Sequence, residues 1–203
     1  MRETGRVRLP MLLALMLVVL AGCAVRAPEP PDAGRVMDIA AWEVADAPER
    51  WRFRGRTSLQ LGDAGATASV SWRQTPASYR IDLRGALGAG GLRLVGDARG
   101  VSLATAAGET YRADNARELV RAITGYDLPV GFLRHWVTAH PVPWLPGRVT
   151  LDAEGRPRAL DQAGWTVTLD DYRRVAGRHL PGRIGVSHEA MRLRLVIGDW
   201  RLP

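Results

Sequence analysis

The sequence predicts an α+β domain that is mostly antiparallel β-sheet, with about ten strands and two short helices. From Trp51 onward, apolar residues recur at every second position, which is the spacing of a strand with one buried face. Glycine and proline residues separate these runs at short intervals, as turns do. Two stretches in the middle of the chain instead space their apolar residues by three and four, which indicates helices.

The first strand shows the alternation most clearly. Trp51, Phe53, Thr57, Leu59 and Leu61 point one way, and the residues that point the other way are Arg52, Arg54, Arg56, Ser58 and Gln60. The pattern returns in 68–72 and in 79–83, with Pro76 in the turn between them, so the chain forms an antiparallel meander. Further strands are predicted at Leu92–Leu94, Val101–Leu103, up to Tyr111, Val149–Leu151, Trp165–Leu169, Ile184–Val186 and Met191–Ile197.

The two helices lie between these strands. Asn115 and Glu118 form a capping box, and Gly125 ends the helix that they begin. A second helix follows Pro129, carries Phe132, Leu133, Trp136 and Val137, and stops before Pro141. A third, thinner helical pattern spans Val36 to Arg50 and ends at Pro48.

A sheet of this many strands curls, and a curled sheet needs apolar material against its concave face. Two short helices are too few to fill it, which favours an apolar cavity between sheet and helices. An ordinary core packed by the seven tryptophans explains the pattern equally well. Both interpretations remain open at this point.

The N-terminus has the pattern of a secretory signal peptide. Arg2, Arg6 and Arg8 precede an apolar run, 11–20, that is too short for a transmembrane helix. We therefore expect residues 1–22 to be removed, residues 23–35 to form a lipidated, proline-rich tether, and residues 36–203 to form a single domain. No other stretch has the ~20 apolar residues that a membrane span requires.

Leu20-Ala21-Gly22-Cys23 resembles the lipobox of bacterial lipoproteins. The resemblance implies cleavage before Cys23, a diacylglycerol thioether on its sulfur and an acyl group on its nitrogen. Two or more chains anchor a protein stably. Ala24 at the second mature position, rather than aspartate, implies the periplasmic face of the outer membrane. Cys23 is the only cysteine, so no intrachain disulfide can form.

The chain is basic, with a formal charge of +7. Loss of residues 1–22 removes three arginines and one glutamate and leaves +5. Because alternation places Trp51 and Phe53 on the face opposite Arg52, Arg54 and Arg56, the aromatics cannot stack bases beside the arginines, which excludes this common mode of nucleic-acid binding. Anionic lipid headgroups are the better partner for an exported basic protein.

The glycine-rich turn 85–91 does not match a phosphate-binding loop, because no Lys-Ser or Lys-Thr follows it and no helix begins there. It is typical of a tight hairpin loop. Leu87 is a large apolar residue at its expected tip, which indicates a contact with membrane.

No catalytic or metal-binding pattern is present. The four histidines, His135, His140, His179 and His188, are scattered and lack the spacing of metal ligands. Ser187-His188-Glu189 are adjacent and read as a hairpin turn, whereas the members of a triad come from distant positions. We therefore expect no enzyme, no cofactor and no metal site.

A set of landmarks spans the chain from Trp51 to Trp200. They are Trp51 with Gly55-Arg56, Trp72 before Tyr79, Gly85-Ala86-Leu87-Gly88, Leu119 to Gly125 leading to Leu128-Pro129-Val130, Leu133 and Trp136, Gln162-Ala163-Gly164-Trp165 with Tyr172, Leu180-Pro181, and Leu195-Val196-Ile197 before Trp200. In this order they resemble the LolB family of outer-membrane lipoprotein receptors.

The resemblance implies a curved, incomplete (half-open) β-barrel of about ten or eleven strands, lidded by short helices, with an apolar cavity. It implies a monomeric receptor that accepts lipoproteins from a soluble periplasmic carrier by binding their acyl chains, and that inserts them into the outer membrane. Leu87 is then the exposed leucine of the membrane-insertion loop. The candidate cavity residues are Trp51, Phe53, Leu59, Trp72, Tyr79, Ile81, Leu83, Leu92, Leu94, Trp136 and Trp165. The alternatives are a structural lipoprotein that tethers a partner without lipid cargo, and a periplasmic hydrolase.

Overall fold

The computed structural model describes residues 34–85, 90–125 and 127–203. Its compact unit spans Gly34–Pro203 and contains the hydrophobic core of the described residues. Its strands are β1 (Arg35–Asp38), β2 (Trp51–Leu61), β3 (Ala64–Gln74), β4 (Ser78–Gly85), β5 (Gly91–Asp97), β6 (Gly100–Thr105), β7 (Thr110–Ala113), β8 (Gly147–Leu151), β9 (Pro157–Gln162), β10 (Trp165–Asp170), β11 (Arg173–Val175), β12 (Arg178–Leu180), β13 (Arg183–His188) and β14 (Met191–Arg201). The helices are η1 (Ile39–Ala41), α2 (Ala116–Thr124) and α3 (Val130–Trp136).

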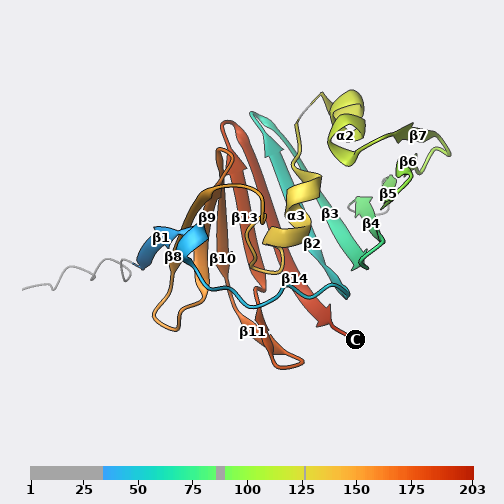
Figure 1. Ribbon diagram of the computed structural model, residues 1–203. Helices are drawn as coiled ribbons and strands as arrows, with labels where there is room; N and C mark the ends of the chain where they lie inside the picture. Colours follow the sequence, from blue (N-terminus) through green and yellow to red (C-terminus); the bar gives the residue numbers. More distant parts are fainter. Residues whose placement is uncertain (1–33, 86–89, 126) are drawn as a thin grey trace, which may run out of the picture. The chain divides into compact units, whose positions relative to one another are not determined.

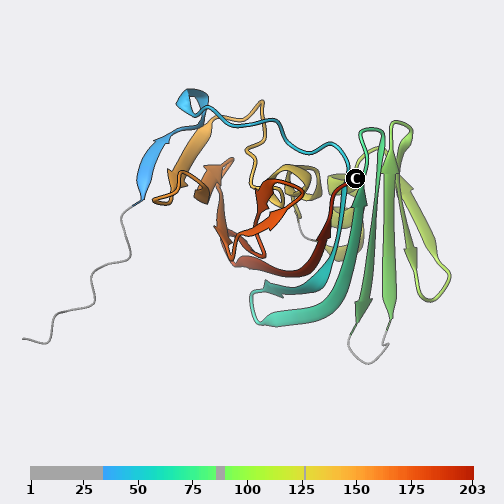
Figure 2. The ribbon, with the colours of Figure 1, turned by 90° about the horizontal axis from the view of Figure 1, so that it is seen from below.

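Twelve of the described strands form one antiparallel sheet in the order β1-β8-β9-β10-β13-β14-β2-β3-β4-β5-β6-β7, and β11 pairs with β12 in a separate hairpin. The sheet does not close, because β1 and β7 are its two edges. It bends strongly, so that it has a concave and a convex face (Figure 2). The predicted open, curved, mostly antiparallel fold is confirmed.

The chain order explains why helices cover the concave face. The strands from β2 to β7 form a meander that ends at one edge of the sheet, while β8 begins near the other edge. The chain must therefore cross the sheet between them, and it does so through α2 and α3 (Figure 1). Contacts of α2 with β6, β7 and α3 hold α2 at one side of the crossing.

A β-bulge contributes to the bend. The pairing of β14 with β2 shifts register between Ile197 and Asp199, and bulges increase local twist and curvature. Opposite the bulge lies Gly55, where a Cβ atom would approach the Val196 carbonyl oxygen to 2.2 Å. Only glycine allows this close passage of the two backbones.

Both predicted central helices are confirmed. The Asn115 side chain accepts a hydrogen bond of 2.8 Å from the Glu118 N–H, and Gly125 ends α2 with a φ of 76°. Val130 to Trp136 form α3 directly after Pro129.

The predicted helix at Val36–Arg50 is wrong. Residues 35–38 form the edge strand β1, a single 3₁₀ turn follows, and no regular structure continues to Arg50. Residues 35–38 instead pair with β8, which satisfies their backbone hydrogen bonds. A helix here would have too small an apolar face to be stabilised by packing.

The short strands β9, β11 and β12 were not predicted. In β9 the buried positions include Pro157 and Gln162, and a proline and an amide hide the apolar alternation.

Candidate functional site

The concave face carries apolar side chains in register across the sheet. Directly paired residues share a face, so strand pairing places one row from β14 to β6. The row consists of Trp200, Phe53, Trp72, Ile81, Leu94 and Leu103, and all six are buried. The alternation therefore identified the correct face of the sheet.

An aromatic cluster fills the half of the concave face that lies near the start of β2. Ring centroids are 5.8 Å apart for Trp51 and Phe53, 5.3 Å for Trp51 and Trp72, and 5.1 Å for Phe53 and Trp200. Tyr79 lies 6.5 Å from Trp72 at the margin. In this half, the expected cavity residues Trp51, Phe53 and Trp72 pack against one another as core.

Gln162 fastens α3 and the loop after it to the sheet. Its Oε1 accepts hydrogen bonds from Trp136 Nε1 (3.1 Å) and the Val142 N–H (2.8 Å). Its Nε2 donates to the carbonyl oxygens of Val142 (3.1 Å) and Leu145 (2.9 Å). Gln162 is 2 % exposed and Trp136 is fully buried, so the bonds to Trp136 and Val142 are shielded from water. The alternation could not reveal this residue, because a buried amide reads as a surface residue.

Gln162→Leu is expected to lower the free energy of unfolding by about 3 kcal/mol, because it leaves several buried donors and acceptors without partners. Urea unfolding measures the loss. Gln60→Leu is the matched control, since Gln60 is exposed and makes one long bond of 3.5 Å to the Gly62 carbonyl oxygen. Equal losses for the two variants would contradict the role given to Gln162.

The other half of the concave face remains accessible. Five leucines, here called the rim leucines, lie near the hairpin ends of β14, β2, β4 and β5 and are half-buried or exposed: Leu59, Leu61, Leu83, Leu92 and Leu193. On β3 between them, the register places Ala64, Ala66 and Ala68, whose side chains are small. Apolar surface is thus available inside the curved sheet at the end that carries the β4–β5 turn.

Two buried hydroxyls border this surface. Thr57 Oγ1 and Thr105 Oγ1 have no hydrogen-bond partner within the part of the chain that the structure describes. Thr57 pairs with Leu195 and Ala68, and Thr105 pairs with Leu92, so both share the face of the rim leucines.

Trp165 lies between α3 and the end of β13. Its ring centroid lies 6.3 Å from that of Trp136 and 4.8 Å from that of His188, which ends β13. Beside it is a surface pocket of about 460 Å³ whose lining includes Arg148, Asp161 and Gln162. Because polar groups form much of its wall, this pocket does not by itself form a chamber for hydrocarbon.

The four histidines lie on different parts of the fold: His135 in α3, His140 in the loop after it, His179 on β12 and His188 on β13. In the described residues, no group of three His, Cys, Asp or Glu side chains is arranged to hold a metal ion. Ser187 and His188 end β13 and Glu189 forms the following turn with a φ of 49°, as predicted for a hairpin. His188 stacks on Trp165, and His179 is exposed on β12.

His135 makes the fold sensitive to acid. Burial, reinforced by the charge of Arg134, lowers the pKa of His135 to about 4, and its Nε2 accepts a 3.1 Å hydrogen bond from Arg134 Nε. Since the pKa in the unfolded chain is ~6.5, only the unfolded state gains the proton between these values. The contribution of His135 to stability is therefore unchanged above pH ~6.5 and falls as the pH drops from ~6.5 to ~4.

The expected loss is about 1 kcal/mol, because the half-exposed ring is partly screened by solvent. Urea unfolding at neutral and acidic pH measures it. His135→Gln should reduce the pH dependence and His179→Gln should not. An unchanged pH dependence in His135→Gln would assign the loss to other groups.

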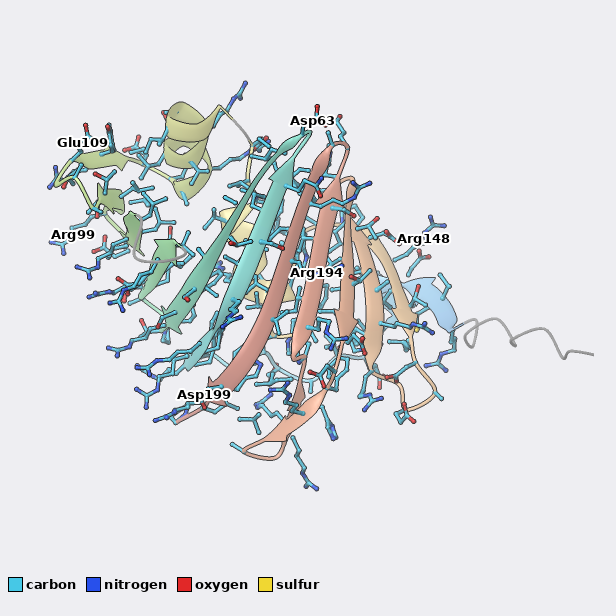
Figure 3. All side chains as sticks on the ribbon, turned by 180° about the vertical axis from the view of Figure 1, so that it is seen from behind. Asp63, Arg99, Glu109, Arg148, Arg194 and Asp199 are labelled. Carbon is cyan, nitrogen blue, oxygen red and sulfur yellow. The ribbon has the colours of Figure 1, made fainter. Side chains whose placement is uncertain are left out.

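The convex face is basic (Figure 3). We call the outward-pointing arginines of β14, β2, β3 and β4 the arginine face: Arg192, Arg194, Arg201, Arg52, Arg54, Arg56, Arg73, Arg80 and Arg84. Arg194 lies near the middle of the view in Figure 3. The predicted separation of arginines from Trp51 and Phe53 is confirmed, since the aromatics are buried on the concave side.

Two predicted site residues, Cys23 and Leu87, lie outside the described residues. The structure does show that β4 and β5 pair as an antiparallel hairpin, so residues 86–90 connect two neighbouring strands at the rim. None of the helices within the described ranges is long and apolar enough to cross a membrane.

An open antiparallel sheet that curves around an apolar face and carries crossing helices defines a half-barrel fold. A domain from Vibrio parahaemolyticus, described as an outer-membrane lipoprotein-sorting protein, superposes with a TM-score of 0.52 over 75% of this chain and 84% of that chain, at 12% identity. This likeness concerns the fold alone.

The sequence comparisons are more specific. The family model of outer membrane lipoprotein LolB matches residues 49–200. The outer-membrane lipoprotein LolB of Alkalilimnicola ehrlichii is 38% identical over 193 residues, which cover 95% of this chain and 96% of the relative. That of Halorhodospira halophila is 34% identical, covering 94% and 95%. The chain belongs to the LolB family, as its landmarks indicated.

Proposed function

We propose that this protein is a receptor that accepts lipoproteins by binding their acyl chains and inserts them into the outer membrane. It receives them from a soluble periplasmic carrier and acts as a monomer, anchored at the periplasmic face by lipid on Cys23. The observation that carries the proposal is the accessible set of rim leucines inside the curved sheet, in a chain of the LolB family. No step of this function requires a catalytic residue.

The physical task is to shield acyl chains during transfer, because each methylene moved into water costs ~0.8 kcal/mol. Chains that leave the carrier can lie against the rim leucines without crossing water. Direction then comes from affinity differences, the receptor binding the chains more tightly than the carrier and the bilayer more tightly still. The aromatic cluster forms a packed core beside this surface.

A hydrophobic fluorescent probe tests the proposal. Residues 24–203, without signal peptide and anchor cysteine, are titrated with the probe and then with a diacylated lipoprotein. Saturable binding that the lipoprotein displaces is the expected result. Absence of binding would instead favour a structural lipoprotein that tethers a partner.

Cys23→Ala is expected to give a soluble periplasmic protein that still accepts lipoprotein, because the rim leucines belong to the unit from Gly34 to Pro203 and not to the anchor. Cell fractionation measures the location, and transfer of labelled lipoprotein from the carrier measures acceptance. Cys23→Ser is a second unlipidated variant that should behave alike. Loss of acceptance in both folded variants would contradict the separation of anchor and binding surface.

A further inference from the structure

The arginine face places like charges directly opposite each other. Along one row, Arg201 pairs with Arg52, Arg52 with Arg73 and Arg73 with Arg80. Facing like charges on neighbouring strands destabilise a sheet. The fold therefore carries a repulsion that a layer of negative charge would relieve.

Few carboxylates neutralise this face. Asp82 is bound by Arg80 Nε at 2.8 Å and by Arg93 Nε at 2.7 Å, and Asp199 is bound by Arg201 Nε at 3.1 Å. Seven of its arginines form no ion pair with any residue in the described ranges: Arg52, Arg54, Arg56, Arg73, Arg84, Arg192 and Arg194. Their guanidinium groups are permanently charged and free to bind anions.

The same face lacks the features of a protein-binding surface. Serine and threonine lie between the arginines, as at Ser58, Thr67 and Ser69, and the outward positions of these four strands include no aromatic residue. Val196 is its one large apolar side chain with substantial exposure. Protein interfaces usually centre on buried aromatic and apolar anchors, whereas a membrane of anionic headgroups requires charge alone.

The face also lies within reach of a bilayer. Ten residues separate Cys23 from Gly34, which can span at most about 35 Å when fully extended. Arg84 stands next to Gly85, the last residue of β4 before the segment 86–89, which contains Leu87. When Leu87 enters the hydrocarbon, as the proposed function requires, arginines at this end of β4 would meet headgroups.

We propose that the arginine face binds the anionic headgroups of phospholipids in the membrane to which the protein is anchored, and so holds the domain against the surface where it delivers its cargo. The proposal rests on the proposed function for the anchor and the delivery step. The binding itself is a separate property that can be measured without cargo.

Co-sedimentation of residues 24–203 with phosphatidylethanolamine vesicles, with and without phosphatidylglycerol, tests it. Binding should require phosphatidylglycerol and should fall between about 0.1 M and about 1 M salt, as the Debye length shortens from ~10 Å to ~3 Å. The triple variant Arg56→Gln, Arg84→Gln and Arg194→Gln should bind these vesicles at least about tenfold more weakly than the original chain. Its melting temperature should not fall, since none of the three arginines forms an ion pair that the substitutions would break.

The matched control is Arg35→Gln, Arg121→Gln and Arg174→Gln, which removes the same charge from exposed positions on β1, α2 and β11 that do not belong to the arginine face. Equal loss of vesicle binding in both triples would overturn the proposal, because net charge alone would then explain it. Unchanged vesicle binding by the first triple, with loss of transfer from the carrier, would overturn it in favour of a docking surface for an acidic protein. The probe titration above decides the proposed function separately, because it contains no membrane.

Discussion

Replacing Leu92 with aspartate is expected to reduce lipoprotein acceptance at least about tenfold while the domain stays folded. An acyl chain laid over the rim leucines would bury the new carboxylate, and an unpaired charge in an apolar environment costs several kcal/mol. Leu92 is 39% exposed in the free protein, so the substitution removes little core packing. Transfer of labelled lipoprotein from the carrier measures acceptance, and urea unfolding measures the stability.

Val196→Asp is the matched control for this substitution. Val196 is 41% exposed, close to the value for Leu92, but it lies on the convex face. The two variants change the charge equally and differ in the face that they modify. Acceptance should persist in Val196→Asp, and a Leu92→Asp variant that accepts lipoprotein normally would remove the rim leucines from the binding surface.

The sequence alone could predict which side chains of a strand point to the buried face, because this follows from local backbone geometry. Alternation in 51–61 separates buried Trp51 and Phe53 from exposed Arg52 and Arg54, and the structure agrees. Caps at Asn115 and Gly125 likewise fix α2 through short-range hydrogen bonds. Features of this kind depend on neighbours within a few residues and need no knowledge of the fold.

Which apolar residues form core and which remain accessible could not be read from the same pattern. Phe53 and Leu59 lie on one face of one strand, six residues apart, yet Phe53 is buried beneath Trp51 and Trp200 while Leu59 is only partly covered. The difference depends on where the crossing from β7 to β8 passes and on what stacks from distant strands. Gln162 illustrates the same limit, because its partners Trp136 and Val142 are twenty or more residues away.

The two faces of the sheet have different proposed roles: the concave face binds acyl chains and the convex face binds lipid headgroups. Apolar side chains of β2, β4, β5 and β14 face inward for acyl chains, and the arginines of β14, β2, β3 and β4 face outward for headgroups. Because side chains alternate along a strand, β2, β4 and β14 each contribute to both surfaces. Substitutions at neighbouring positions, such as Leu83 and Arg84, should therefore affect acceptance and membrane binding separately.

Leu87→Glu is expected to leave acceptance intact and to lower delivery into outer-membrane vesicles by about tenfold or more. Residues 86–90 connect β4 and β5 at the rim, and a glutamate there resists entry into hydrocarbon, where a charge costs ~2.5 kcal/mol or more. Acceptance depends on the rim leucines, which this substitution does not change. Delivery is measured as labelled lipoprotein transferred from the loaded receptor to vesicles.

Leu87→Met is the matched control, because methionine keeps an apolar side chain of similar size. It should deliver nearly as well as the original chain, which would show that apolar character at this position, rather than the leucine shape, drives the step. An equal loss of acceptance and delivery in Leu87→Glu would place Leu87 in the core.

Arg84 stands three residues before Leu87, so the double variant Leu87→Glu with Arg84→Gln separates hydrocarbon entry from headgroup attraction. Additive losses in delivery would indicate two independent contacts with the bilayer.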